Sequence, residues 1–294
     1  MSEVDAFIVG VPKAGTTWLA NVISQNPGVA LSDPKEPNVI ASHKGTFGRD
    51  TRDPDWSRYD ECFSGEGIRI DASIHSFACP LAPTRMSSRM PGIPMILCLR
   101  EPVSRAVSHW KMIRDTEEDV RNGEDWADFS VAWADDRLSD DSHYGQSMQR
   151  WLEHFSLEQF LIIDSQRMRR EPEAVLSEVE AFLGLGTHSY DLDPSRHANS
   201  ATDRRPITAI GRLVRAAFSL IPAFAKRPIV TRLQARDINI YAAPVISRKA
   251  EKFSAGPEHY SICSDSVCED LRLFESLTGF DTSRWVDNIE SSRQ

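Results

Sequence analysis

The sequence has no long hydrophobic run. No apolar stretch approaches the roughly 20 residues that a transmembrane helix needs, and residues 1–5 lack the composition of a signal peptide. These absences argue against a membrane-spanning protein and against a typical secreted one. We therefore expect a cytoplasmic protein without a membrane anchor.

Cysteine is also scarce. The sequence of 294 residues holds five cysteines, an odd number without metal-ligand spacing. They are Cys62, Cys79, Cys98, Cys263 and Cys268. This pattern predicts reduced thiols rather than a disulfide framework. We expect no metal site.

Basic residues are fewer than acidic ones. The sequence has 34 Lys and Arg residues against 43 Asp and Glu residues, which gives a formal net charge of −9. Such a charge disfavours general nucleic-acid binding. Residues 204–252 are nevertheless strongly basic, which suggests a local contact with an anionic ligand or surface.

Predicted strands and helices alternate along the chain. Segments typical of strands lie at 6–9, 29–31, 68–73, 95–99 and 160–164, and the segment at 68–73 has a polar end. This order predicts a three-layer α/β/α fold with a central, mostly parallel sheet. The hydrophobic content of 40% is enough for a sizeable core.

We expect one domain over residues 1–294, because this length is within the range of a single α/β domain. Its core would span 6–185. A basic helical segment would occupy 204–252, and a C-terminal helix would lie within 264–285.

The stretch from Gly10 to Thr17 joins the first predicted strand to a helix. Gly10, Gly15 and Thr17 fit the spacing of the nucleotide P-loop, G-x-x-x-x-G-K-[ST]. Thr16 stands where that motif has its lysine, and a lysine occurs instead inside the loop, as Lys13. We infer a P-loop-like loop that binds a phosphate at a helix N-terminus. The alternative is an ordinary strand–helix turn.

A second anion site is indicated where the run at 95–99 ends in Arg100. Pro102 can open the following helix, and that helix carries Ser108. An arginine at the end of a strand and a serine in the next helix can converge on one phosphate. Alternatively, Arg100 pairs with a neighbouring acid such as Glu101 or Asp115, and Ser108 is an ordinary helix residue.

Glu36 is the first candidate for acid–base chemistry. It lies in a loop beside Lys35, and Pro34 and Pro37 keep that loop out of a helix. The alternative is a solvated ion pair at the surface. His75 is a second candidate, although a lone histidine in a loop is more often structural.

Residues 12–19, Pro-Lys-Ala-Gly-Thr-Thr-Trp-Leu, closely resemble the 5′-phosphosulfate loop of sulfotransferases that use 3′-phosphoadenosine 5′-phosphosulfate (PAPS). The resemblance is to the branch acting on heparan sulfate and to bacterial relatives. It implies that PAPS is the co-substrate and that no metal is required. The residues that it places at the nucleotide are Lys13, Ala14, Gly15, Thr16, Thr17, Trp18, Arg100 and Ser108. A basic stretch completes the 3′-phosphate site in relatives, and here Arg204 or Arg205 would serve.

The resemblance also implies catalytic roles. Glu36 would be the base that takes the acceptor proton, and Lys13 would neutralise charge on the bridging oxygen. Relatives often have a lysine where this chain has Ala72, so that contribution is absent or comes from elsewhere. His75 is then a substitute or a rival base.

The function we predict is transfer of a sulfuryl group from PAPS to a hydroxyl, in preference to an amine, of a small-molecule, glycan or lipid acceptor. A P-loop kinase using ATP is one alternative. A non-catalytic module that binds a phosphonucleotide is another. The basic residues 204–236 would cap the nucleotide, pack on the core or contact an anionic membrane peripherally.

Overall fold

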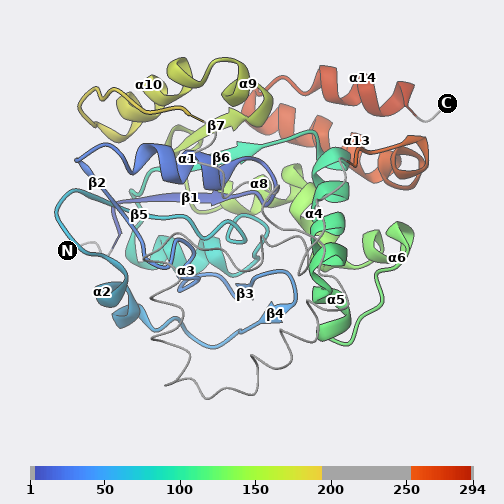
Figure 1. The fold of residues 1–294 in the computed structure, drawn as a ribbon, viewed down its shortest axis with the longest axis horizontal. Coiled ribbons are helices and arrows are strands. Elements are labelled where there is room, and N and C mark those ends of the chain that lie inside the picture. Colours follow the sequence, from blue (N-terminus) through green and yellow to red (C-terminus); the bar gives the residue numbers. More distant parts are fainter. Residues whose placement is uncertain (1–3, 194–252, 293–294) are drawn as a thin grey trace.

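The computed structural model describes residues 4–193 and 253–292 (Figure 1). Its centre is a five-stranded sheet in which every neighbouring pair of strands is parallel. The strands, in spatial order, are β2 (Val29–Leu31), β5 (Ile68–Asp71), β1 (Ala6–Gly10), β6 (Met95–Leu99) and β7 (Phe160–Asp164). The predicted parallel sheet is confirmed.

The central strands are apolar because both faces of the sheet are covered. Every residue of β1 and β6 is buried, as expected for a parallel sheet between helical layers. In Figure 1, α9 (Ser165–Arg170) and α10 (Pro172–Leu183) lie on one side of the strands and α3 (Ala82–Arg89) lies on the other. This arrangement confirms the predicted α/β/α class.

The strand order brings three carboxyl ends together. β1 lies between β5 and β6, although the chain forms β2 directly after β1. The chain thus builds the sheet first on one side of β1 and then on the other. Ligands of open α/β sheets bind at such a reversal, outside the carboxyl ends of the strands. The loops after Gly10, Asp71 and Leu99 all begin at this edge.

The remaining elements surround this sheet. α1 (Thr16–Ile23) follows β1, and α4 (Pro102–Thr116) follows β6 and begins at the predicted proline. The others before α9 are β3 (His43–Lys44), β4 (Gly48–Arg49), α2 (Tyr59–Cys62), α5 (Glu118–Arg121), α6 (Phe129–Trp133), α7 (Asp136–Ser139) and α8 (Tyr144–Leu152), with short 3₁₀ turns at Trp56–Arg58, Asp140–Ser142 and Leu157–Gln159.

The acidic stretch 115–141 is partly core. Trp126, in the loop between α5 and α6, and Phe129, the first residue of α6, are buried, 1% and 4% exposed. The indole Nε1 of Trp110 donates a hydrogen bond to the Trp126 carbonyl at 2.7 Å. The apolar residues of this stretch therefore attach it to α4, and two of its acids, Asp119 and Asp141, are buried as well.

The helical region at the C-terminal end of the chain is longer than the sequence predicted. It forms α13 (Pro257–Thr278) and α14 (Ser283–Ser291) rather than one helix within 264–285. The carboxylate of Asp270 accepts hydrogen bonds from the amides of Gly145 and Gln146, at 2.7 and 2.9 Å. These bonds fix α13 at the start of α8.

Two predictions concern the basic segment, its helical nature over 204–252 and a membrane contact through 204–236. Both lie outside the described residues. Within the part of the chain that the structure describes, no helix combines the length and apolar character needed to cross a membrane.

Candidate active site

The loop between β1 and α1 has the backbone of an anion-binding turn. Lys13 and Gly15 have φ angles of 71° and 87°, and a Cβ at Gly15 would collide with the methyl group of Met168. Helix α1 begins at Thr16, and no side chain caps its N-terminus. Its first amide groups and the positive end of its dipole are therefore available to a phosphate.

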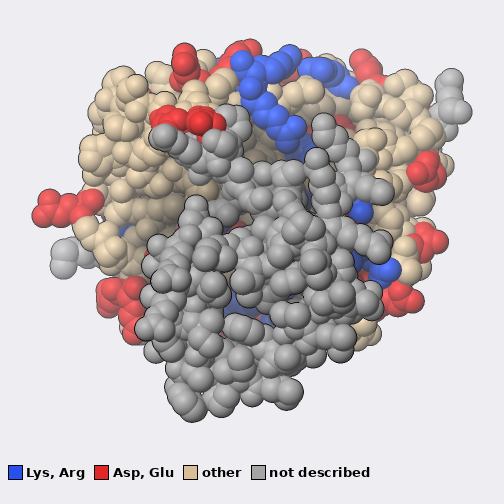
Figure 2. Space-filling view, viewed as in Figure 1, with Lys and Arg blue, Asp and Glu red and all other residues tan. Residues whose placement is uncertain are grey.

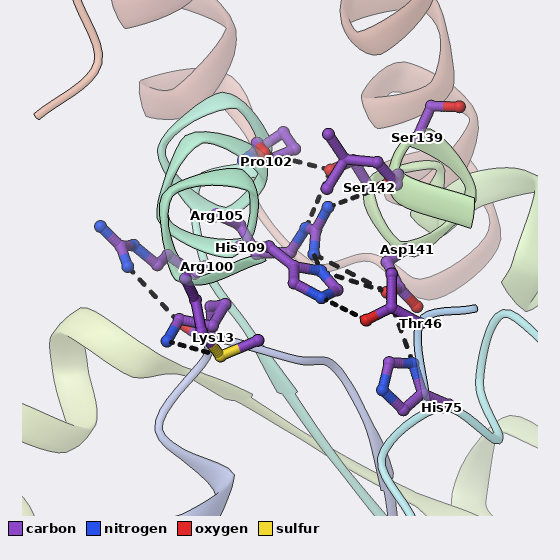
Figure 3. Close-up of polar contacts among 12 residues, drawn as sticks. Lys13, Thr46, His75, Arg100, Pro102, Arg105, His109, Ser139, Asp141 and Ser142 are labelled. Carbon is purple, nitrogen blue, oxygen red and sulfur yellow. Dashed lines mark hydrogen bonds and ion pairs between the residues drawn. The ribbon is translucent and has the colours of Figure 1, made fainter. Parts of the chain in front are cut away.

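The structure brings Lys13 and Arg100 together. A guanidinium nitrogen of Arg100 donates a hydrogen bond to the Lys13 carbonyl at 3.4 Å, and Lys13 Nζ lies 3.7 Å from the sulfur of Met112 (Figure 3). The two residues follow adjacent strands, β1 and β6. The two cations that the sequence assigned to separate ends of the nucleotide thus lie beside one loop.

Arg100 does not form the ion pairs that the sequence left open. The Glu101 carboxylate accepts hydrogen bonds from the amides of Val103 and Ser104, both at 2.9 Å, and thereby caps α4. Asp115 pairs with Lys111 at 2.9 Å. Burial lowers the pKa of Arg100 from its ordinary value, and the charge of Arg169 lowers it further. A half-buried arginine that has no carboxylate partner in the described part of the chain suits an anionic ligand.

The other predicted nucleotide residues lie in the phosphate loop, on α1 and on α4. Ala14 and Thr16 are buried, whereas Thr17 and Trp18 are half-buried. Ser108 is also half-buried and lies on α4, the helix that Arg100 precedes. Arg204 and Arg205 lie outside the described residues.

The loop that carries Glu36 is fastened to the carboxyl end of β5. The Ala72 amide donates to the Lys35 carbonyl at 3.2 Å, and the Asn38 amide donates to Ser73 Oγ at 2.9 Å. The Lys35 ammonium lies 2.7 Å from Glu36 Oε1 and donates to the Ala72 carbonyl at 3.4 Å. Glu36 is therefore held at the same sheet edge as the phosphate loop, in an ion pair that is only partly exposed.

Sequence reasoning missed Asp71, which lies directly beneath this loop. It is fully buried, and its carboxylate accepts hydrogen bonds from Tyr59 Oη at 2.8 Å and from the Ser73 amide at 2.7 Å. Burial raises the pKa of Asp71 to about 6, and the charge of Glu36 adds to the rise. Its position at the carboxyl end of a predicted strand was the one available signal.

His75 belongs to a buried network of polar and charged side chains that includes Asp141 and, from α4, Arg105 and His109 (Figure 3). Its Nδ1 lies 3.6 Å from Asp141 Oδ2, and the same oxygen lies 3.6 Å from His109 Nδ1 and 3.9 Å from Arg105 Nη1. His109 Nε2 lies 2.9 Å from Thr46 Oγ1. This network gives His75 a structural partner.

Two further sequence features are placed by the fold. Val39 and Ile40, which follow the Glu36 loop, are 3% and 1% exposed and pack in the core. Among the described residues, no group of three or more His, Cys, Asp or Glu side chains is arranged to hold a metal ion.

Residues 3–202 match the family model described as the sulfotransferase domain. The chain belongs to this sulfotransferase family. The matched range includes the phosphate loop, the Glu36 loop, Arg100 and Ser108, so the resemblance inferred from residues 12–19 is confirmed. The enzymes of the family transfer a sulfuryl group from PAPS.

The sulfotransferase is similar to two kinds of heparan sulfate enzyme. It is 27% identical over 190 residues to the human heparan sulfate glucosamine 3-O-sulfotransferase 5, covering 61% of this chain and 53% of that protein. It is 27% identical over 190 residues to the bifunctional heparan sulfate N-deacetylase/N-sulfotransferase 1 of Caenorhabditis elegans, covering 62% and 22%. The chain therefore matches about half or less of the length of these relatives.

A solved structure supports the fold. The sulfotransferase from Alicyclobacillus acidocaldarius superposes with a TM-score of 0.60 at 19% identity, over 97% of this chain and 99% of that one. At this identity the likeness concerns the fold alone.

Proposed function

We propose that this sulfotransferase transfers a sulfuryl group from PAPS to a hydroxyl group of a glycan. The observation that carries the proposal is the convergence of Lys13, Arg100 and Glu36 at one sheet edge. The hydrogen bond from Arg100 to the Lys13 carbonyl and the hydrogen bonds that join the Glu36 loop to Ala72 and Ser73, just after β5, support it. The edge thereby combines an anion-binding loop with a candidate base.

The nucleotide would lie across the loop between β1 and α1. The amides at the start of α1, with Thr16 and Thr17, would bind the 5′-phosphate. Arg100 and Ser108 would bind the 3′-phosphate, and Trp18 would flank the adenine. The half-buried Arg100 has no carboxylate partner among the described residues, which suits this role.

The transfer step needs one base and one cation. Glu36 would remove the proton of the acceptor hydroxyl while the acceptor oxygen forms a bond to sulfur. The bond from sulfur to the bridging oxygen breaks in the same step, and its electron pair stays on the 5′-phosphate of the departing bisphosphate. Lys13 would neutralise the charge that develops there.

The charges around the Glu36 loop favour an acidic acceptor. Lys44 Nζ donates to the Asn38 carbonyl, Arg58 to the Pro37 carbonyl at 3.5 Å and Arg85 to the Ile40 carbonyl at 2.8 Å. Carbonyl oxygens satisfy these donors without cancelling their charge. The names of the relatives give heparan sulfate as their acceptor. A glycan bearing carboxylate or sulfate groups fits both observations.

Radiolabelled sulfate transfer tests the proposal directly. PAPS labelled in the sulfuryl group would be incubated with the protein and with heparan sulfate, N-desulfated heparan sulfate or a neutral glucan. We expect label on heparan sulfate and none on the neutral glucan, whereas label confined to the N-desulfated glycan would place the transfer on an amine and contradict the hydroxyl acceptor. Label on none of them, under conditions where the protein binds the bisphosphate product, would contradict the glycan assignment while leaving the cofactor assignment intact.

A further inference from the structure

Arg100 and Arg169 come after two adjacent strands, β6 and β7, at the carboxyl edge of the sheet where the phosphate loop lies. β6 and β7 pair in parallel with Leu99 opposite Asp164. Arg100 follows the first strand, and α9 begins directly after the second and carries Arg169. Met168 of the same helix contacts the phosphate loop at Gly15. Helix α9 therefore lies against the loop, and Arg169 on this helix is close enough for its charge to act on Arg100.

No acid within residues 4–193 and 253–292 forms an ion pair with Arg169. Its helix neighbour Arg167 forms ion pairs with Glu178 and, at 3.3 Å, with Glu171. Arg169 is exposed and, in the part of the chain that the structure describes, makes neither a hydrogen bond nor an ion pair. In Figure 2, a band of Lys and Arg side chains runs over α9 toward the centre of the view.

Two like charges side by side are unfavourable unless an anion offsets them. Arg100 is half-buried, and the two acids that the sequence offered as its partners, Glu101 and Asp115, have other partners. The charge of Arg169 acts on Arg100 strongly enough to lower its pKa, after the larger effect of burial. Among the described residues, no carboxylate neutralises either guanidinium group, so an added anion would offset both charges.

We propose that Arg169 binds the 3′-phosphate of the nucleotide together with Arg100. The inference rests on the proposed function, since it assumes that a nucleotide with a 3′-phosphate occupies the loop. A phosphate monoester carries a charge of about −1.5 to −2 at neutral pH, so one arginine leaves it only partly neutralised. The guanidinium groups of Arg100, which follows β6, and of Arg169, on α9, would together complete the balance.

Calorimetric titration of the full chain tests this assignment with two ligands. The first is 3′-phosphoadenosine 5′-phosphate and the second is adenosine 5′-phosphate, which lacks the 3′-phosphate. We expect Arg169→Ala to weaken binding of the first about tenfold, as for loss of one charge-assisted contact, and to change binding of the second less than twofold. Arg169→Lys should restore part of the affinity, because it keeps the charge.

Arg170→Ala is the matched control, because Arg170 is the next residue of the same exposed helix. It should leave both affinities unchanged. Equal weakening of both ligands by Arg169→Ala, or no weakening of either, overturns the assignment. A wild-type protein that binds the two ligands equally overturns the proposed cofactor itself, so the two failures are distinguishable.

Discussion

Lys35 and Glu36 form an ion pair that rests on the carboxyl end of β5. The Lys35 ammonium lies 2.7 Å from Glu36 Oε1 and donates a hydrogen bond to the Ala72 carbonyl at 3.4 Å. The resemblance to relatives leads one to expect a lysine at position 72. The ammonium of Lys35 reaches that position from the neighbouring loop, so a cation is present although the side chain of Ala72 supplies none.

Replacing Glu36 by Gln should lower kcat by about 10²–10⁴-fold, the usual effect of losing a general base. The amide keeps the size of the side chain but cannot accept the acceptor proton. Binding of 3′-phosphoadenosine 5′-phosphate should stay nearly unchanged, because Glu36 is not part of the phosphate loop. Steady-state sulfate transfer and calorimetric titration measure the two effects separately.

His75→Ala is the comparison for the rival base. His75 has a buried partner in Asp141, so we expect this variant to lose thermal stability more than catalytic rate. A folded His75→Ala protein without activity, next to a Glu36→Gln protein with normal turnover, would move the role of base to His75.

Lys35→Ala should reduce kcat by about tenfold or less. A partly exposed ion pair contributes at most about 1 kcal/mol, so loss of the ammonium should disturb the position of Glu36 without removing the base. Arg272→Ala breaks an exposed ion pair of the same length, 2.7 Å, on α13, and should leave kcat unchanged. Equal effects of the two substitutions would show that Lys35 has no special role.

Nucleotide preference separates the sulfotransferase from a kinase. At about a hundred times its dissociation constant, a ligand stabilises the native state by roughly 2.7 kcal/mol. We expect 3′-phosphoadenosine 5′-phosphate to raise the melting temperature clearly and ATP with Mg²⁺ to raise it much less. Lys13→Ala should diminish the first shift and also lower turnover. A larger shift with ATP would favour the kinase.

The burial of Asp71 predicts that the free energy of unfolding depends on pH. Its pKa is raised to about 6 in the folded state from an ordinary value of 3.8, so between these values the folded protein binds more protons than the unfolded chain. Stability should therefore fall as pH rises from about 4 to 6. Urea unfolding should show wild-type protein losing up to roughly 3 kcal/mol relative to Asp71→Asn across this range. A constant difference between the two proteins would contradict the assignment.

The sequence by itself determined individual strands, helix ends and the residues of the phosphate loop. The apolar runs at 95–99 and 160–164 became β6 and β7 with the predicted bounds, because consecutive buried residues leave few alternatives to a parallel strand. Pro102 and Gly184 fixed the start of α4 and the end of α10, because proline suits a first turn and glycine tolerates a left-handed φ, here 67°. The residues of the phosphate loop were also predictable, since that site is built from contiguous backbone.

The tertiary structure decided which distant residues share the site. The contacts of Lys35 with Ala72 and of Asn38 with Ser73 join two loops that lie far apart in the sequence. The approach of Arg169 to Arg100 depends on the pairing of β6 with β7. Periodicity reports whether a residue is buried but not which strand lies beside it. Strand order, which sets these neighbours, follows from the packing of the whole chain.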